Sequence, residues 1–204
     1  MTSLLEQMRN GGTEPVPPFA VLLPPGWLSL EPTKEALREL ADRASGVFRS
    51  QHRPDLDGRF RVLMDRAARE LLQRDPVRIM LPGGDVPPED LFPLSIIVAR
   101  VTAPENGPLD AKVHELVRRH GAAPFDEDAQ IMRWHSDGRL DLDGGVATVR
   151  SFNYLIAIPG TERHSALLFT GVLPVSAGER LDDDTIAGAQ ALMDAIMSTF
   201  RWSR

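Results

Sequence analysis

The 204-residue sequence contains no cysteine, and this absence removes several kinds of chemistry at once. A chain without thiols has no disulfide, no thiolate metal ligand, no thiol nucleophile and no cysteine for lipid attachment. Lysine is scarce as well, because only Lys34 and Lys112 of the 23 basic residues are lysines. Together with frequent Ala, Gly and Pro, this preference for arginine indicates coding bias in a GC-rich bacterial genome.

Long apolar runs and a basic net charge are also missing. The longest strongly apolar run, Leu94–Ala99, is far shorter than the ~20 residues that a membrane-spanning helix needs. The first twelve residues lack the apolar core of a signal peptide. A formal charge of −6 disfavours general nucleic-acid binding, which depends on neutralising phosphates. We therefore expect a cytoplasmic protein that binds neither nucleic acid nor membrane.

The composition that remains is typical of a globular protein. Hydrophobic residues make up 42% of the chain and charged residues 25%, which suffices for a real core. Residues 1–17 are polar and contain several Gly and Pro, which predicts a frayed or disordered lead-in. Residues 18–204 contain no repeat and no low-complexity linker, so we expect a single domain there.

Hydrophobic spacing predicts an α+β fold rather than regular βαβ alternation. The predicted helices are Thr33–Ser50, Asp57–Arg74, Leu109–His120 and a closing helix that begins at Asp182–Asp184. The predicted strands are Phe19–Leu23, Val77–Leu81, Leu94–Val101, Gln130–His135, Val146–Ile158 and Ala166–Val172. The segments HSDG (135–138) and IPGTERH (158–164) indicate hairpin turns. We expect a mainly antiparallel central sheet with helices packed on its faces.

The segment FAVLLPPGW, at residues 19–27, has two interpretations. It is either part of a binding site or a strand that ends at the two prolines. Alternation along a strand would turn Phe19, Val21 and Leu23 toward the core. The two prolines end the strand because proline has no N–H for the ladder. We interpret Trp27 as a plug at the end of the sheet, since a buried Trp hides ~150–250 Å².

Four segments of the chain resemble a known family. They are FAVLLPPGW near the start, then YLIAIPG, ALLFTGVLP and the closing ALMDAIMSTFRW. This strand–strand–helix ending is similar to the fold shared by photosystem PsbP proteins, the Ran-binding Mog proteins and the mycobacterial LpqN lipoproteins. The resemblance implies an α-β-α sandwich with a central antiparallel sheet. It also implies a bias toward protein-binding adaptors, and it supplies no catalytic residue.

The motifs of catalytic and metal-binding sites are not satisfied. His114 and His120 in VHELVRRH are six residues apart, which separates them by about 240° around a helix and prevents shared zinc binding. LPGGDVPPED lacks the signature of a phosphate loop, and no G-x-S-x-G motif occurs. The acidic groups at 126–128, 141–143 and 182–184 do not follow calcium-loop spacing. We predict no catalytic residue, no metal ligand and no cofactor.

One predicted strand carries a polar face that could take part in binding. Arg133 and His135 alternate with apolar residues, so both lie on the same side of the strand. A small anion pocket would form if polar residues of the next strand stood nearby. The candidate ligand-binding residues are Arg133, His135, Asn153 and Tyr154. The favoured alternative is a strand with one solvent-exposed face, which is common in antiparallel sheets.

These observations leave three functional hypotheses. The first is a non-catalytic protein-binding or adaptor domain that docks another protein. The second is a small-ligand binder or enzyme with a pocket near Arg133 and His135. The third is self-association, in which Val62 and Leu72 would face a second copy of the chain. The sequence favours the first, because no catalytic signature is present and because the family resemblance implies adaptors.

Overall fold

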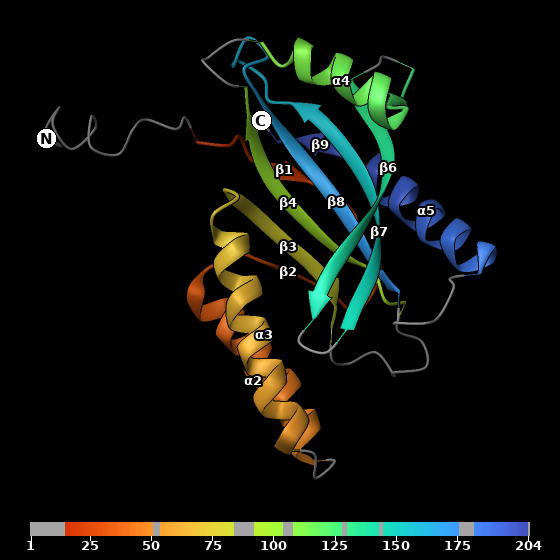
Figure 1. Ribbon diagram of the computed structural model, residues 1–204. Coiled ribbons are helices and arrows are strands. Elements are labelled where there is room, and N and C mark those ends of the chain that lie inside the picture. The colour runs from red at the N-terminus through yellow and green to blue at the C-terminus, as the bar shows by residue number, and fades with distance from the viewer. Residues whose placement is uncertain are drawn as a thin grey trace, which may run out of the picture.

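A computed structural model describes residues 15–50, 54–83, 92–103, 108–127, 130–142, 145–175 and 182–203. Its central feature is a seven-stranded sheet in the order β2-β3-β4-β8-β7-β6-β5, in which every neighbouring pair is antiparallel (Figure 1). The fold is therefore of the α+β class, with helices packed on the sheet, and this prediction is confirmed.

The elements follow the chain in an order close to the predicted one. The strands of the large sheet are β2 (Trp27–Leu30), β3 (Pro76–Pro82), β4 (Ser95–Thr102), β5 (Ala123–Pro124), β6 (Ile131–Leu142), β7 (Gly145–Ala157) and β8 (Ser165–Val175). The helices are α2 (Lys34–Ser50), α3 (Pro54–Leu72), α4 (Asp110–His120) and α5 (Asp183–Ser198). A separate pair, β1 (Phe19–Ala20) and β9 (Arg201–Trp202), is also antiparallel.

Local chemistry explains where the helices begin and end. The Thr33 hydroxyl accepts the N–H of Ala36 at 3.1 Å before α2, and the Asp182 carboxylate accepts the N–H of Thr185 at 2.7 Å before α5. Both are N-caps that satisfy otherwise unpaired helical N–H groups. Gly121 ends α4 with φ of 64°, a left-handed conformation that glycine adopts without strain. All three termini were predicted from the sequence.

Alternation along β7 divides the interior into two cores on opposite faces of the sheet. Phe152, Tyr154 and Ile156 belong to the larger core with α5, and Leu155 belongs to a smaller core with residues of α4. Figure 1 shows α4 in front of the sheet and α5 behind it, together with β1 and β9. The sheet is thus covered by helices on both faces.

The FAVLLPPGW segment lies against the larger core. Phe19, Val21, Leu23 and Trp27 are partly buried there, so the predicted inward orientation is confirmed. Only Phe19–Ala20 form a strand, which pairs with β9 instead of joining the large sheet. The Phe19 ring stands edge-on to the ring of Phe169 at 5.5 Å between centroids, a favourable aromatic geometry. The segment therefore closes the back of the molecule.

The predicted turn at HSDG is wrong. Strand β6 continues through 135–138 to Leu142, and Asp137 pairs with Arg150 across the ladder to β7. A Cβ on Gly138 would come within 3.1 Å of a Val149 methyl, so glycine serves here for a close approach between strands and not for a turn. Tertiary pairing overrides the local turn preference of Ser, Asp and Gly.

Some predicted features fall partly outside the described residues. Of the predicted lead-in, residues 1–14 lie outside, while Val16 packs partly buried against the larger core. Of the LPGGDVPPED segment, 84–90 lie outside, and Gly83 donates its N–H to the carbonyl of Gly26 at 2.7 Å. The short strands β2, β5 and β9 were not predicted, because runs of two to four residues carry too little periodicity.

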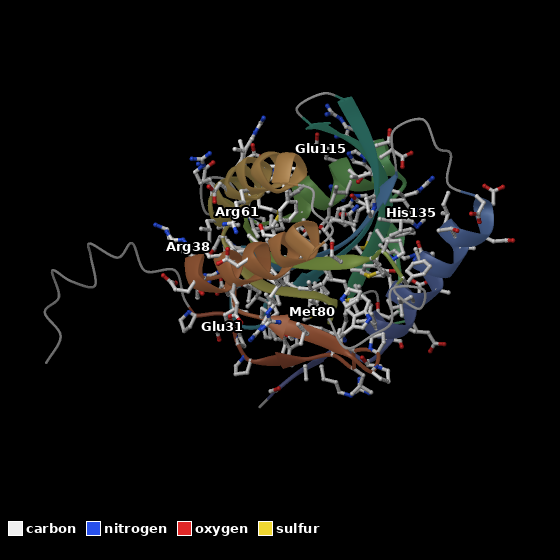
Figure 2. The ribbon with its side chains drawn as sticks, turned by 90° about the horizontal axis from the view of Figure 1, so that it is seen from below. Glu31, Arg38, Arg61, Met80, Glu115 and His135 are labelled. Atoms are coloured by element: carbon white, nitrogen blue, oxygen red, sulfur yellow. The ribbon has the colours of Figure 1, made fainter. Side chains whose placement is uncertain are left out.

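Helices α2 and α3 form a hairpin at the β2–β3 end of the sheet. The closest backbone contacts of each helix are with the other helix of the hairpin. In Figure 1 the hairpin lies beside the β2–β3 edge and extends past the ends of the strands. Figure 2 shows it on the same side of the sheet as Glu115 of α4. By burial, the described part of the hairpin and α4 are both less enclosed than α5.

A glycine-to-alanine comparison tests how tightly α5 packs on the sheet. A Cβ on Gly171 of β8 would lie 2.6 Å from the Met193 sulfur and 2.9 Å from its Cγ. We expect Gly171→Ala to lower the free energy of unfolding by about 1–3 kcal/mol, because a packed core resists added volume. Denaturant titration measures the change, and adding Met193→Ala should cost less than the sum of the two single changes.

The matched control is Gly58→Ala on α3, where the new methyl would meet no other part of the described structure within 4 Å beyond its own stretch of helix backbone. There the same substitution should stabilise the chain by roughly 0.5–1 kcal/mol, because alanine favours a helix. Equal effects at the two glycines would contradict close packing of Met193 over Gly171.

Candidate functional site

Polar side chains of β6, β7 and α5 meet between the sheet and the helix. Period-two alternation sets Arg133 and His135 on one face of β6, and the register places Arg133 opposite Tyr154 of β7. Spacing of four residues sets Gln190 and Asp194 on one face of α5. We call these five residues the Asp194 network.

The Asp194 carboxylate is the centre of this network. Its Oδ2 accepts a hydrogen bond from Arg133 Nη1 at 2.8 Å. Its Oδ1 accepts from the Tyr154 hydroxyl at 2.5 Å and from Gln190 Nε2 at 2.8 Å. The Gln190 Oε1 is bonded to His135 Nε2, so this ring nitrogen carries a proton. Every polar side chain of the network has a partner within it.

Burial fixes the charge state of the phenol. Tyr154 is 0% exposed, and this burial raises its pKa far above the ordinary value of 10.0 because it disfavours the tyrosinate. The hydrogen bond to the negative Asp194 raises the pKa further, and it outweighs the opposing influence of the Arg133 charge. Tyr154 is therefore a neutral hydrogen-bond donor and is poorly suited to act as a base.

The ring of Phe125 contacts two residues of the network. The Phe125 ring stands edge-on to Tyr154 at 5.4 Å, and the Arg133 guanidinium lies 5.6 Å from the Phe125 centroid. The second distance is within the range of a cation–π contact. These contacts fix the orientation of Arg133 toward Asp194. The arrangement fastens α5 to the sheet by charge, hydrogen bonds and packing together.

The four candidate residues from the sequence are divided between two faces. Arg133, His135 and Tyr154 come together in the Asp194 network. Asn153 points to the opposite face, where it donates to the Ser136 hydroxyl at 3.1 Å and accepts from the Thr170 hydroxyl at 3.1 Å. It links β6, β7 and β8 and is only 5% exposed. The face of β6 with Arg133 is only partly covered by α5, because His135 and Asp137 on it are exposed and the Arg133 side chain is 35% exposed.

Gln190 and Asp194 are part of the network, and they were missed from the sequence. A signal for them exists, because they are polar residues four apart in the middle of an otherwise apolar helix. Ala189 and Met193, their immediate neighbours in sequence, are fully buried. A polar pair beside a buried stripe must find partners, since an unpaired buried polar group costs about 1–3 kcal/mol. That reasoning would have pointed to polar residues on the facing strands.

Several hollows lie elsewhere among the described residues, among them a shallow one on α4 lined by Ala111, His114, Val117 and Arg118. Another, of about 260 Å³, lies near the start of α4, and its lining includes Leu109, Met132 and Arg163. A third, of about 290 Å³, is a groove between α2 and α3. In the part of the chain that the structure describes, no group of three or more His, Asp or Glu residues is placed to hold a metal ion. In that part, no helix is long and apolar enough to cross a membrane.

Comparison with known proteins adds one distant structural likeness. No protein-family model matches the sequence, and no curated protein is significantly similar to it. A crystal structure of a protein from Bacteroides thetaiotaomicron VPI-5482 is similar with 8% identity and a TM-score of 0.44. The match covers 91% of this chain and 45% of that one, so this chain spans less than half the length of that protein.

Alkaline titration tests the burial of Tyr154, which is the only tyrosine in the sequence. Below pH 10 the phenol is protonated in both the folded and the unfolded chain, so it adds no pH dependence to stability. Above that pH the unfolded chain loses its proton first. We expect its contribution to the free energy of unfolding to fall by up to about 1.4 kcal/mol per pH unit.

Ultraviolet absorbance of tyrosinate measures this directly. The folded chain should show no tyrosinate until it unfolds, whereas the chain in denaturant should titrate near pH 10. Tyr154→Phe should lose this part of the alkaline slope and keep the part due to other groups. A reversible titration near pH 10 in the folded chain would show that Tyr154 is open to solvent.

Removal of the central carboxylate tests whether the network fastens α5. We expect Asp194→Ala to lower the free energy of unfolding by about 2–3 kcal/mol, because it removes hydrogen bonds to a charged group and leaves Arg133 unpaired. The matched control is Glu115→Ala, which breaks an exposed pair with Arg119 on α4 and should cost less than about 0.5 kcal/mol. Similar losses in both variants, measured by denaturant titration, would refute a fastening role.

Proposed function

We propose that this chain is a non-catalytic protein-binding domain and that the α2–α3 hairpin is its contact surface. The observation that carries this proposal is the poor burial of the hairpin. Among the α2 and α3 side chains whose burial is described, only Leu37 and Ser45 are buried. By contrast, α5 buries four apolar or small residues against the sheet.

The hairpin sequence contains more apolar surface than the described structure buries. Both helices have a stripe of apolar residues at helical spacing. Such a stripe is typical of a helix face that packs against another surface. Most of the described residues of these stripes are only half-buried, and the hairpin lies near the β2–β3 edge (Figure 1). Val62 on α3 is 61% exposed although it is a large aliphatic residue. Apolar surface left open in this way is typical of a protein interaction site.

The alternative, a small-ligand site near Arg133 and His135, has weaker support. Arg133 already pairs with Asp194, and His135 is bonded to Gln190. An anionic ligand would have to displace a carboxylate that three donors hold in place. The network therefore serves stability better than ligand binding, and it leaves the hairpin as the stronger candidate surface.

We also propose a cellular compartment and a class of partner for the protein. We place it in the bacterial cytoplasm, with another protein as its partner and with no role for nucleic acid or membrane. The likeness of its strand and helix segments to PsbP, Mog and LpqN proteins agrees with an adaptor role, and membership of that fold family is part of the proposal.

Site-specific photocrosslinking in the source cell tests the proposed surface. A benzophenone amino acid replaces Val62 on α3 in one variant and the exposed Lys112 on α4 in a matched control. We expect illumination to join the position-62 variant to a discrete partner protein, because the crosslinker would lie within the interface. The position-112 variant should give no such adduct. Absence of an adduct at position 62, or the same adduct from both positions, would contradict the proposal.

A further inference from the structure

We infer that the groove between α2 and α3 binds an acidic amphipathic helix of another protein. This inference rests on the proposed function and specifies the chemistry of the partner. It depends on the shape of the groove and on the charged side chains along its rim.

The floor of the groove is apolar and hollow. Its lining includes Leu37 and Ala41 of α2 and Met64, Ala68 and Leu72 of α3. The two alanines leave space between larger neighbours, which produces a volume of about 290 Å³. Lining residues 34–41 of α2 span two helical turns, or roughly 11 Å at 1.5 Å per residue. This length accommodates two turns of a helix lying along the hairpin.

A helix is the occupant that the geometry of the hairpin favours. Two packed helices form a furrow along their seam, and a third helix fills that furrow in helical bundles. Val62 extends the apolar surface beyond the groove, because it lies three residues before the rim residue Asp65 on the same side of α3. A docked helix would present apolar residues at i, i+3 or i+4, and i+7.

The rim of the groove carries an excess of positive charge. Lys34, Arg38 and Arg69 line it, against the single acid Asp65. None of these four side chains forms an ion pair or hydrogen bond within the described part of the chain. Neighbouring arginines of the same helices do pair, with Glu39 to Arg43 at 2.6 Å and Glu70 to Arg66 at 3.1 Å. Figure 2 shows Arg38 at the outer margin of the hairpin.

These unpaired cations select the charge of the partner. Complementary charge around an apolar contact improves both association rate and specificity. Acidic residues flanking the apolar stripe of the partner helix would meet Lys34, Arg38 and Arg69. A second copy of this chain is a poorer occupant, because a two-fold contact between identical grooves would bring the cationic rims together. The apolar floor and the overall charge of −6 disfavour a nucleic acid.

Binding of two model helices to the full chain tests this inference. Both are fluorescent peptides of equal length with leucines at i, i+3, i+4 and i+7, and they differ only in glutamate or lysine at the flanking positions. We expect the glutamate peptide to bind about tenfold more tightly by fluorescence anisotropy, since three rim cations favour it. Raising the salt concentration should shrink this preference, because exposed charges are screened.

Variants of the chain assign the binding to the groove. The double change Arg38→Glu and Arg69→Glu should reverse the preference between the peptides, whereas Arg118→Glu on α4 should leave it unchanged. Ala68→Trp fills the groove and should abolish binding of the glutamate peptide. Far-ultraviolet circular dichroism shows whether each variant is folded. If Ala68→Trp does not fold, the peptide preference of the Arg38→Glu and Arg69→Glu double variant still tests the groove.

The outcomes separate this inference from the proposed function. Equal binding of the two peptides, or binding of neither, overturns the acidic-helix partner. If a photocrosslinked partner still forms at position 62, the protein-binding function stands without it. Light scattering gives a further check, because a dimer that Ala68→Trp dissociates would show that a second copy occupies the groove and would overturn the inference.

Discussion

The packing of α5 against the sheet is the interaction on which the larger core depends. Met193 occupies the space left by the missing side chain of Gly171, and it is fully buried there. The next residue, Asp194, joins Arg133 of β6 and Tyr154 of β7. The apolar contact supplies burial, while the directional hydrogen bonds fix the rotation and height of the helix. With α5 placed, the chain can return through β9 and pair with β1.

The same sheet supports its other elements far less firmly. Helix α4 contributes no fully buried residue, although Leu109 just before it is buried in the smaller core. The closest backbone contacts of the α2–α3 hairpin are between its own two helices. Burial of apolar surface is the dominant favourable term in folding, so stability is concentrated on the α5 face. The front of the molecule has only the smaller core, against which Val113 and Leu116 of α4 pack half-buried.

Sequence reasoning reached the fold class because periodicity reports burial. The helix ends at Thr33, Gly121 and Asp182 followed from capping chemistry, which is local. The extent of β6 did not follow, because Gly138 and its neighbours resemble a turn until β7 is placed beside them. Only part of the site was predicted. Alternation identified Arg133 and His135, but the α5 partner of Arg133 lies 61 residues away along the chain and that of His135 lies 55 residues away. Contacts at such separation leave no periodic trace in one sequence.

Burial distinguishes Arg133, which needs a charged partner within the fold, from Arg38 and Arg69, which do not. Arg133 is partly enclosed beneath α5 and must have a partner there, because an unpaired charge in such a place is costly. Asp194 provides that partner at 2.8 Å. Arg38 and Arg69 lie in water and need no partner for stability. Placed beside an apolar groove, they gain a favourable interaction only when an acidic surface arrives. Their lack of partners costs the fold nothing, and in the proposed complex it leaves them available to an acidic surface.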